Sequence, residues 1–150
     1  MPLAGLPPKA PVRQHLGAAP EWRPVPLPAG LAFLTAYGVS PAVLLLAAAE
    51  ARRQAIAPEA ALLASGSIGD SFFYRCLAHR LGAAFVDKEV AIGAGVRYPH
   101  AIHAGVAPFD GDAGPAWLAA PRGRLLVDLL ARARGGKRLG ARRAITTPSH

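Results

Sequence analysis

The sequence predicts an α+β fold, with a helical part over residues 30–82 followed by a small α/β part over residues 83–148. The first part holds apolar segments of helical length bounded by glycine, proline and small polar residues. The second part holds short apolar and β-branched runs between turn residues. Residues 1–28 contain eight prolines and no apolar periodicity, which predicts a disordered arm before a single domain over residues 29–150.

About four helices are expected in the helical part, over residues 31–38, 41–55, 58–65 and 70–82. Gly38 suits a left-handed cap after the first helix. Ser40 and Pro41 suit the N-cap and first residue of the second. The apolar residues expected to turn this second helix toward a core are Val43, Leu44 and Leu46.

The helix over residues 70–82 has a broad apolar arc when residues are placed about 100° apart. Arg80 falls within this arc near the helix end, where it can snorkel and cap the last carbonyls, or bind an anion or stack on a base. The expected apolar arc holds Phe72, Phe73, Cys76, Leu77 and Leu81, and the opposite side holds Arg75, Ala78 and Gly82.

The α/β part is expected to contain three to four short strands and two helices. A short helix should begin at Pro99, and an amphipathic helix should cover residues 122–134. The expected strands lie at residues 83–87, 106–109, 116–121 and 142–147, with a turn at 110–115.

A weak internal repeat links the first two helices to the next two. LTAYGVSPAVLLLAAAEAR aligns with LLASGSIGDSFFYRCLAHRL when one extra residue is allowed after the second glycine. The alignment matches Gly38 to Gly66, Val39 to Ile68 and Leu44 to Phe73. An internal repeat and convergent helix-turn-helix punctuation both explain this pattern.

Four residues have the side-chain types that bind zinc: Cys76, His79, His100 and His103. Cys76, however, lies on the expected core side of its helix, and structural zinc usually takes its ligands from tight knuckles. We therefore predict no metal site, and no nucleophilic role for the buried thiol. A single cysteine also excludes an internal disulfide framework.

The net charge of +8 arises largely near the end of the chain. Such a basic patch can be a solvated helix face, or it can bind nucleic acid, anionic lipid or an acidic partner. The absence of interleaved aromatic residues disfavours nucleic acid. The patch holds eight basic residues against the single acid Asp128: Arg122, Arg124, Arg132, Arg134, Lys137, Arg138, Arg142 and Arg143.

No secretory signal is recognisable, and no uncharged apolar run reaches the roughly 18–20 residues needed to cross a bilayer. We therefore expect a soluble chain in the cytoplasm, either free or at the inner face of the cytoplasmic membrane.

LLASGSIGDSFFYRCLAHRLGAAFVD resembles part of the N-terminal domain of the ATPases of type II secretion and type IV pilus machines. It is more similar to the same module ahead of the catalytic domain in bacterial membrane-bound family-2 glycosyltransferases. The pieces RYPHAIHAGVAPF, AWLAAPRGRLLVDLLAR and AITTPSH follow in the order of that module, so the resemblance covers residues 30–150.

This resemblance implies a non-catalytic regulatory or docking module of a glycosyltransferase in polysaccharide synthesis. The implied partner is a membrane-bound catalytic domain, in cis or in trans. The chain has no QxxRW-like element and no membrane span, so we expect that it does not transfer a sugar by itself.

In some members of the wider family, tandem copies of the helical motif bind cyclic di-GMP, which is the alternative function here. The chain departs from that motif where Ala57, Pro58 and Glu59 replace Arg-Leu-Gly and where Arg80 replaces glutamine. The ligand positions implied by the resemblance are Leu62, Leu63, Gly66, Ile68, Phe73, Leu77 and Arg80.

Overall fold

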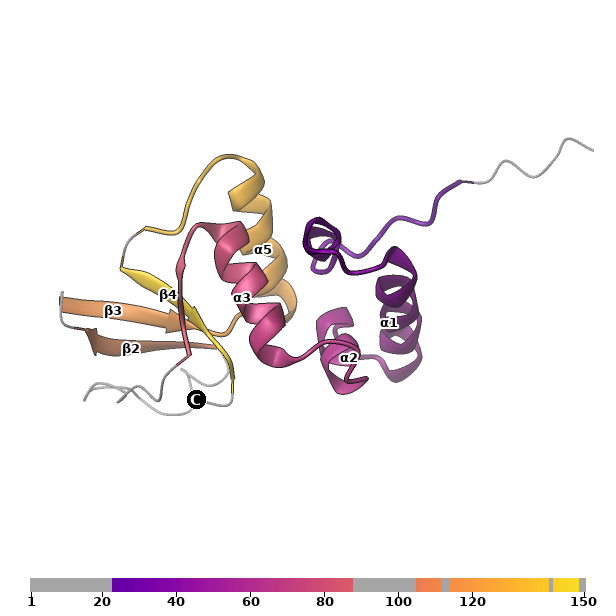
Figure 1. The fold of residues 1–150 in the computed structure, drawn as a ribbon, viewed down its shortest axis with the longest axis horizontal. Coiled ribbons are helices and arrows are strands. Elements are labelled where there is room, and N and C mark those ends of the chain that lie inside the picture. The colour runs from indigo at the N-terminus through magenta and orange to yellow at the C-terminus, as the bar shows by residue number, and fades with distance from the viewer. Residues whose placement is uncertain (1–22, 88–104, 112–113, 141, 149–150) are drawn as a thin grey trace, which may run out of the picture.

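The computed structural model describes residues 23–87, 105–111, 114–140 and 142–148. Residues 1–22 of the predicted arm, and the helix predicted from Pro99, lie outside the described residues. The α+β class is confirmed. Its elements are the 3-10 helix η1 (Ala32–Tyr37), α1 (Pro41–Gln54), α2 (Pro58–Ala64), α3 (Asp70–Leu81), β1 (Ala84–Val86), β2 (Val106–Gly111), β3 (Gly114–Ala119), α5 (Gly123–Arg134) and β4 (Arg143–Thr146) (Figure 1).

The four strands form one mixed sheet in the order β1-β4-β3-β2. β4 runs parallel to both β1 and β3, whereas β2 and β3 form an antiparallel hairpin. Pairing extends to Gly111 and Gly114. The turn predicted over residues 110–115 is therefore too long, because a two-residue loop is enough to join antiparallel strands.

The helices α3 and α5 end at the same side of the sheet, where the strands that follow them begin. α3 leads into β1 and α5 leads into β4, and these two strands run parallel. The C-terminal ends of α3 and α5 therefore lie together where the parallel strands begin, as Figure 1 shows near the top of the view. A backbone hydrogen bond of 3.1 Å from the Leu139 N–H to the Leu81 carbonyl joins the loop after α5 to the end of α3.

α3 occupies the centre of the hydrophobic core. It contacts η1, α5, β1 and β4, and its Phe73 and Leu77 side chains are completely buried. Phe73 packs edge-on against Phe33 of η1, with ring centroids 5.7 Å apart. The same cluster includes Leu126 of α5 and Ile145 of β4, so one continuous core joins the helical and α/β parts.

The predicted arc of α3 is wrong at two positions. Phe72 is 43% exposed, whereas Ala78, expected on the open side, is buried. The buried side is rotated toward Tyr74 and Ala78 because neighbours on several sides enclose the helix. Around the helix axis, Arg80 lies within the buried side, as predicted. Its side chain is nevertheless exposed because it lies in the last turn of α3.

The caps predicted at the junction of η1 and α1 are confirmed, but the predicted core side of α1 is only partly right. Gly38 ends η1 in the left-handed conformation with φ 84°, and Ser40 is the N-cap of α1 and accepts a hydrogen bond from the Ala42 N–H. Leu44 is buried, whereas Leu46 is 71% exposed. α1 packs on α2, and the small buried residues Ala47, Ala48 and Ala51 allow the helices to approach closely where larger side chains would not fit.

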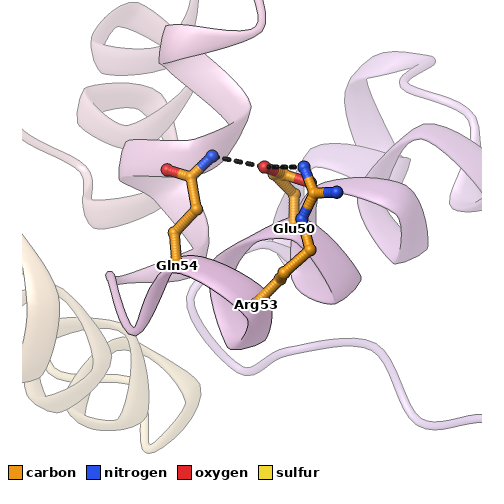
Figure 2. A network of polar contacts seen from close by, with 3 residues as sticks. All are labelled: Glu50, Arg53 and Gln54. Atoms are coloured by element: carbon orange, nitrogen blue, oxygen red, sulfur yellow. Dashed lines mark hydrogen bonds and ion pairs between the residues drawn. The ribbon is translucent and has the colours of Figure 1, made fainter.

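A network of polar side chains lies at the C-terminal end of α1 (Figure 2). The Glu50 carboxylate accepts hydrogen bonds from Arg53, at 2.7 Å, and from Gln54. The bond with Arg53, followed by that with Gln54, lowers the pKa of Glu50 below its usual value. Because the network faces solvent, it contributes little to stability.

The two halves of the predicted repeat share backbone geometry. Gly38 and Gly66 both have positive φ, 84° and 68°. Leu44 and Phe73, which occupy equivalent positions in the helices that follow, are both fully buried. Each half therefore uses a left-handed glycine to turn the chain and a large residue to anchor the next helix.

Replacing Gly105 by alanine should destabilise the fold. Its φ is +61°, and an added Cβ would lie 2.8 Å from the Ala120 carbonyl oxygen. The Ala120 N–H also donates a 2.8 Å hydrogen bond to the Gly105 carbonyl, next to the paired strands β2 and β3. We expect Gly105→Ala to lower the free energy of unfolding by about 1–3 kcal/mol, measured by urea denaturation. Gly140→Ala is the matched control, because nothing lies within 4 Å of its added Cβ. Equal unfolding midpoints for both variants would contradict this packing.

Candidate functional site

The predicted basic patch is divided between the two ends of α5. Arg122 and Arg124 lie at its N-terminal end, and Arg124 faces Asp128 at 3.9 Å. The other six residues lie in its last turn, in the loop that follows or at the start of β4. α5 has 12 residues, so about 18 Å separate its ends. All eight side chains are exposed.

The six residues beyond the middle of α5 join Arg80 of α3, since α3 and α5 end at the same edge. We call this group the basic end of the molecule. Its members are Arg80, Arg132, Arg134, Lys137, Arg138, Arg142 and Arg143. Arg80 is more than 50 positions before the other six residues in the sequence, and the topology of the sheet brings it beside them.

Two adjoining hollows open in the basic end, and both are lined by His79 and Arg80. The first, about 420 Å³, lies between the ends of α3 and α5 and is also lined by Lys137 and Arg138. The second, about 520 Å³, lies between η1, α3 and α5 and is also lined by Arg134. No carboxylate lines either hollow among the residues that the structure describes.

The loop after α5 is fixed onto the end of α3. The aliphatic stem of Arg138 packs over Gly82, where an added Cβ would lie 3.2 Å from the Arg138 Cδ. Gly82 itself is left-handed, with φ 63°, and ends α3 as the sequence predicts. The stem of Arg138 therefore packs against the end of α3, beside the first hollow.

Tyr37 and His79 form the wall shared by η1 and α3. The Tyr37 hydroxyl shares a 2.8 Å hydrogen bond with His79 Nδ1, and the two rings meet edge-on at 5.7 Å. Burial raises the pKa of Tyr37, and Cys76 adds to this shift, whereas the charge of Arg80 opposes it. Tyr37 therefore presents a neutral hydroxyl and an aromatic ring to the second hollow.

A different arrangement holds the other end of α5. Its N-cap, Arg122, provides no side-chain cap, and the Gly123 N–H donates instead to the buried carboxylate of Glu59 in α2. Gly30 lies against this pair, since its added Cβ would be 3.9 Å from Glu59 Oε2. Arg122 Nε donates to the Tyr74 hydroxyl at 3.4 Å. No local sequence pattern indicates this cap, because Glu59 and Gly123 are far apart in the sequence.

Burial also determines the chemistry of Tyr74 and Cys76. It raises the pKa of Tyr74 despite the opposing effect of Arg122. It likewise raises the pKa of the Cys76 thiol, with Arg75 opposing. The Cys76 side chain faces the core as predicted.

Within the described ranges, no group of three or more histidine, cysteine or acidic residues could hold a metal ion. Of the four candidate zinc ligands, Cys76 is buried and His79 is engaged with Tyr37, while His100 and His103 lie outside the described residues.

The seven positions implied for cyclic di-GMP are placed at different depths and at both ends of α3. Leu62, Phe73 and Leu77 are fully buried in the core. Leu63 in α2 and Ile68 in the segment before α3 are half-buried, and Gly66 in that segment is exposed. Arg80 lies near the other end of α3, about 15 Å along the axis from its first residue. The structure therefore does not gather them on one surface, and their role in binding stays a prediction.

No protein-family model matches the chain, and no curated protein matches it. Among the described residues, no helix has both the length and the apolar character required to cross a membrane.

Cys76 should react slowly with thiol reagents in the folded protein. Burial keeps it protonated and shielded, so we expect alkylation by iodoacetamide at pH 8 to be at least about tenfold slower in the native protein than in the urea-unfolded chain. Mass spectrometry at timed intervals provides both rates. Equal native and unfolded rates would contradict the buried position.

Proposed function

We propose that the chain is a non-catalytic regulatory or docking module for a membrane-bound family-2 glycosyltransferase, in the same polypeptide or as a separate subunit. In this role its basic end faces the anionic inner surface of the cytoplasmic membrane. One observation carries the membrane-facing part of the proposal: seven exposed lysine and arginine side chains gather at one end of a rigid core. The sequence resemblance carries the choice of partner.

The basic end is suited to a charged surface because four of its seven cations, Arg80, Arg132, Arg134 and Arg143, project from helices or a strand. Arg132 lies in the last turn of α5, and Arg143 begins β4. Each lysine or arginine close to an anionic lipid surface contributes about 1 kcal/mol to binding, and this attraction fades within a Debye length. A group of seven is therefore sufficient for salt-sensitive attachment without a spanning helix.

The cyclic di-GMP alternative has less support in the geometry. Binding through Leu62, Phe73 and Leu77 would require these side chains to leave the core. Each such leucine or phenylalanine loses about 1.5–3 kcal/mol when it is exposed. Docking through side chains that are already exposed has no comparable cost.

Neutralising the outer cations should weaken membrane binding. We expect the triple variant Arg132→Gln, Arg142→Gln, Arg143→Gln to lose about 3 kcal/mol of binding to phosphatidylglycerol vesicles, roughly a hundredfold in affinity. Co-sedimentation at low and physiological salt measures this loss. The matched control neutralises three cations outside the basic end: Arg52, Arg53 and Arg124.

Equal losses in the two triple variants, or binding independent of salt, would contradict the proposed orientation. The choice of enzyme has its own test in the coding region that follows this chain. Finding neither a membrane segment nor a glycosyltransferase there, fused or adjacent, would count against that partner.

A further inference from the structure

We propose that the two adjoining hollows of the basic end form a binding site for a small phosphorylated ligand. Its phosphoryl group would lie between Arg80, Lys137 and Arg138, and its uncharged part would lie toward Tyr37. The site is distinct from the outer membrane-facing cations, since Arg132, Arg142 and Arg143 line neither hollow.

The charge of the hollows exceeds what the helix ends require. Arg80, Arg134, Lys137 and Arg138 bring four formal positive charges to the two hollows. A helix C-terminus carries about half a negative charge, so α3 and α5 together offset about one unit. A cationic surplus therefore remains, and neither hollow has a carboxylate in the lining that the structure describes.

Capping of helix carbonyls does not account for these side chains either. The Ala78 and His79 carbonyls accept from the Gly82 N–H, and the Leu81 carbonyl accepts from the Leu139 N–H. At the end of α5, the Arg132 and Ala133 carbonyls accept from backbone N–H groups of residues 135–137. Because backbone donors already satisfy these carbonyls, the guanidinium and ammonium groups are available to a ligand.

The volumes and the charged lining of the hollows suit a small anionic ligand. Their volumes, about 420 and 520 Å³, lie within the range of known ligand pockets. Apolar walls at Leu81, Leu130 and Ala133 lower the local dielectric and concentrate the positive field. Arginine and lysine are the side chains that bind phosphate best, the former through paired N–H donors.

Two side chains of the site already have contacts in the free protein. The stem of Arg138 packs over Gly82, and the 2.8 Å bond to His79 orients Tyr37 in the second hollow. A ligand therefore has less side-chain entropy to remove on binding. The aromatic ring of Tyr37 beside Arg80 provides a surface for the uncharged part of the ligand.

Isothermal titration with inorganic pyrophosphate tests the site. We expect saturable binding by the full chain, weakened at least about tenfold in the double variant Arg80→Gln, Lys137→Gln, since charge-assisted contacts are lost. The outer triple variant at Arg132, Arg142 and Arg143 should bind pyrophosphate as the wild type does. Circular dichroism checks that each variant is folded.

A second arm distinguishes a soluble ligand from a lipid headgroup. Binding of phosphatidic acid vesicles that depends on Arg80 and Lys137 more strongly than binding of phosphatidylglycerol vesicles does, without pyrophosphate binding, would assign the phosphoryl group to a lipid. Absence of both activities, or pyrophosphate binding equal in the wild type and the folded double variant, would overturn the site. Loss of vesicle binding in the outer variant alone concerns only the proposed membrane orientation.

Discussion

The buried carboxylate of Glu59 connects the two parts of this fold. It lies in the first turn of α2 and accepts a hydrogen bond from the Gly123 N–H, the first residue of α5. A carboxylate suits this place because helix N-termini present unpaired N–H groups and a partial positive charge. The adjoining N-cap, Arg122, offers no acceptor of its own. The orientation of α5 therefore depends on a residue from the preceding helical part.

The consequences of this cap appear at the opposite end of α5. Once its N-terminus is fixed on α2 and its Leu126 and Leu130 side chains are buried in the core, its last turn must lie beside the end of α3. Arg134, Lys137 and Arg138 then face Arg80 across the hollows. Both proposed activities therefore rest on one geometric constraint. The membrane orientation draws on all seven cations of the basic end, whereas the phosphoryl site uses only the four that line the hollows.

Local patterns in the sequence predicted most of the elements but little of the site. Gly38, Ser40 and Gly82 act as predicted because a cap depends on a few neighbouring residues. The burial of Leu46 and Ala78 was predicted wrongly because it depends on which elements surround each helix. The sequence predicts the basic patch as one continuous segment. Its division between the two ends of α5, and the position of Arg80 beside its second half, follow only from the fold and its strand order. The cap at Glu59 joins residues 64 apart and has no local signal.

The free energy of unfolding of Glu59 variants tests this account most directly. Glu59→Ala leaves the Gly123 N–H without its acceptor and should lower that free energy by about 1–3 kcal/mol. Glu59→Gln keeps an acceptor and loses only the charge, so its loss should be smaller, about 0.3–1 kcal/mol. Glu50→Ala removes a carboxylate whose network faces solvent (Figure 2) and should leave stability nearly unchanged. The loss of stability should be largest for Glu59→Ala, smaller for Glu59→Gln and smallest for Glu50→Ala. A Glu59→Ala protein as stable as Glu50→Ala would contradict the role of Glu59 as the cap of α5.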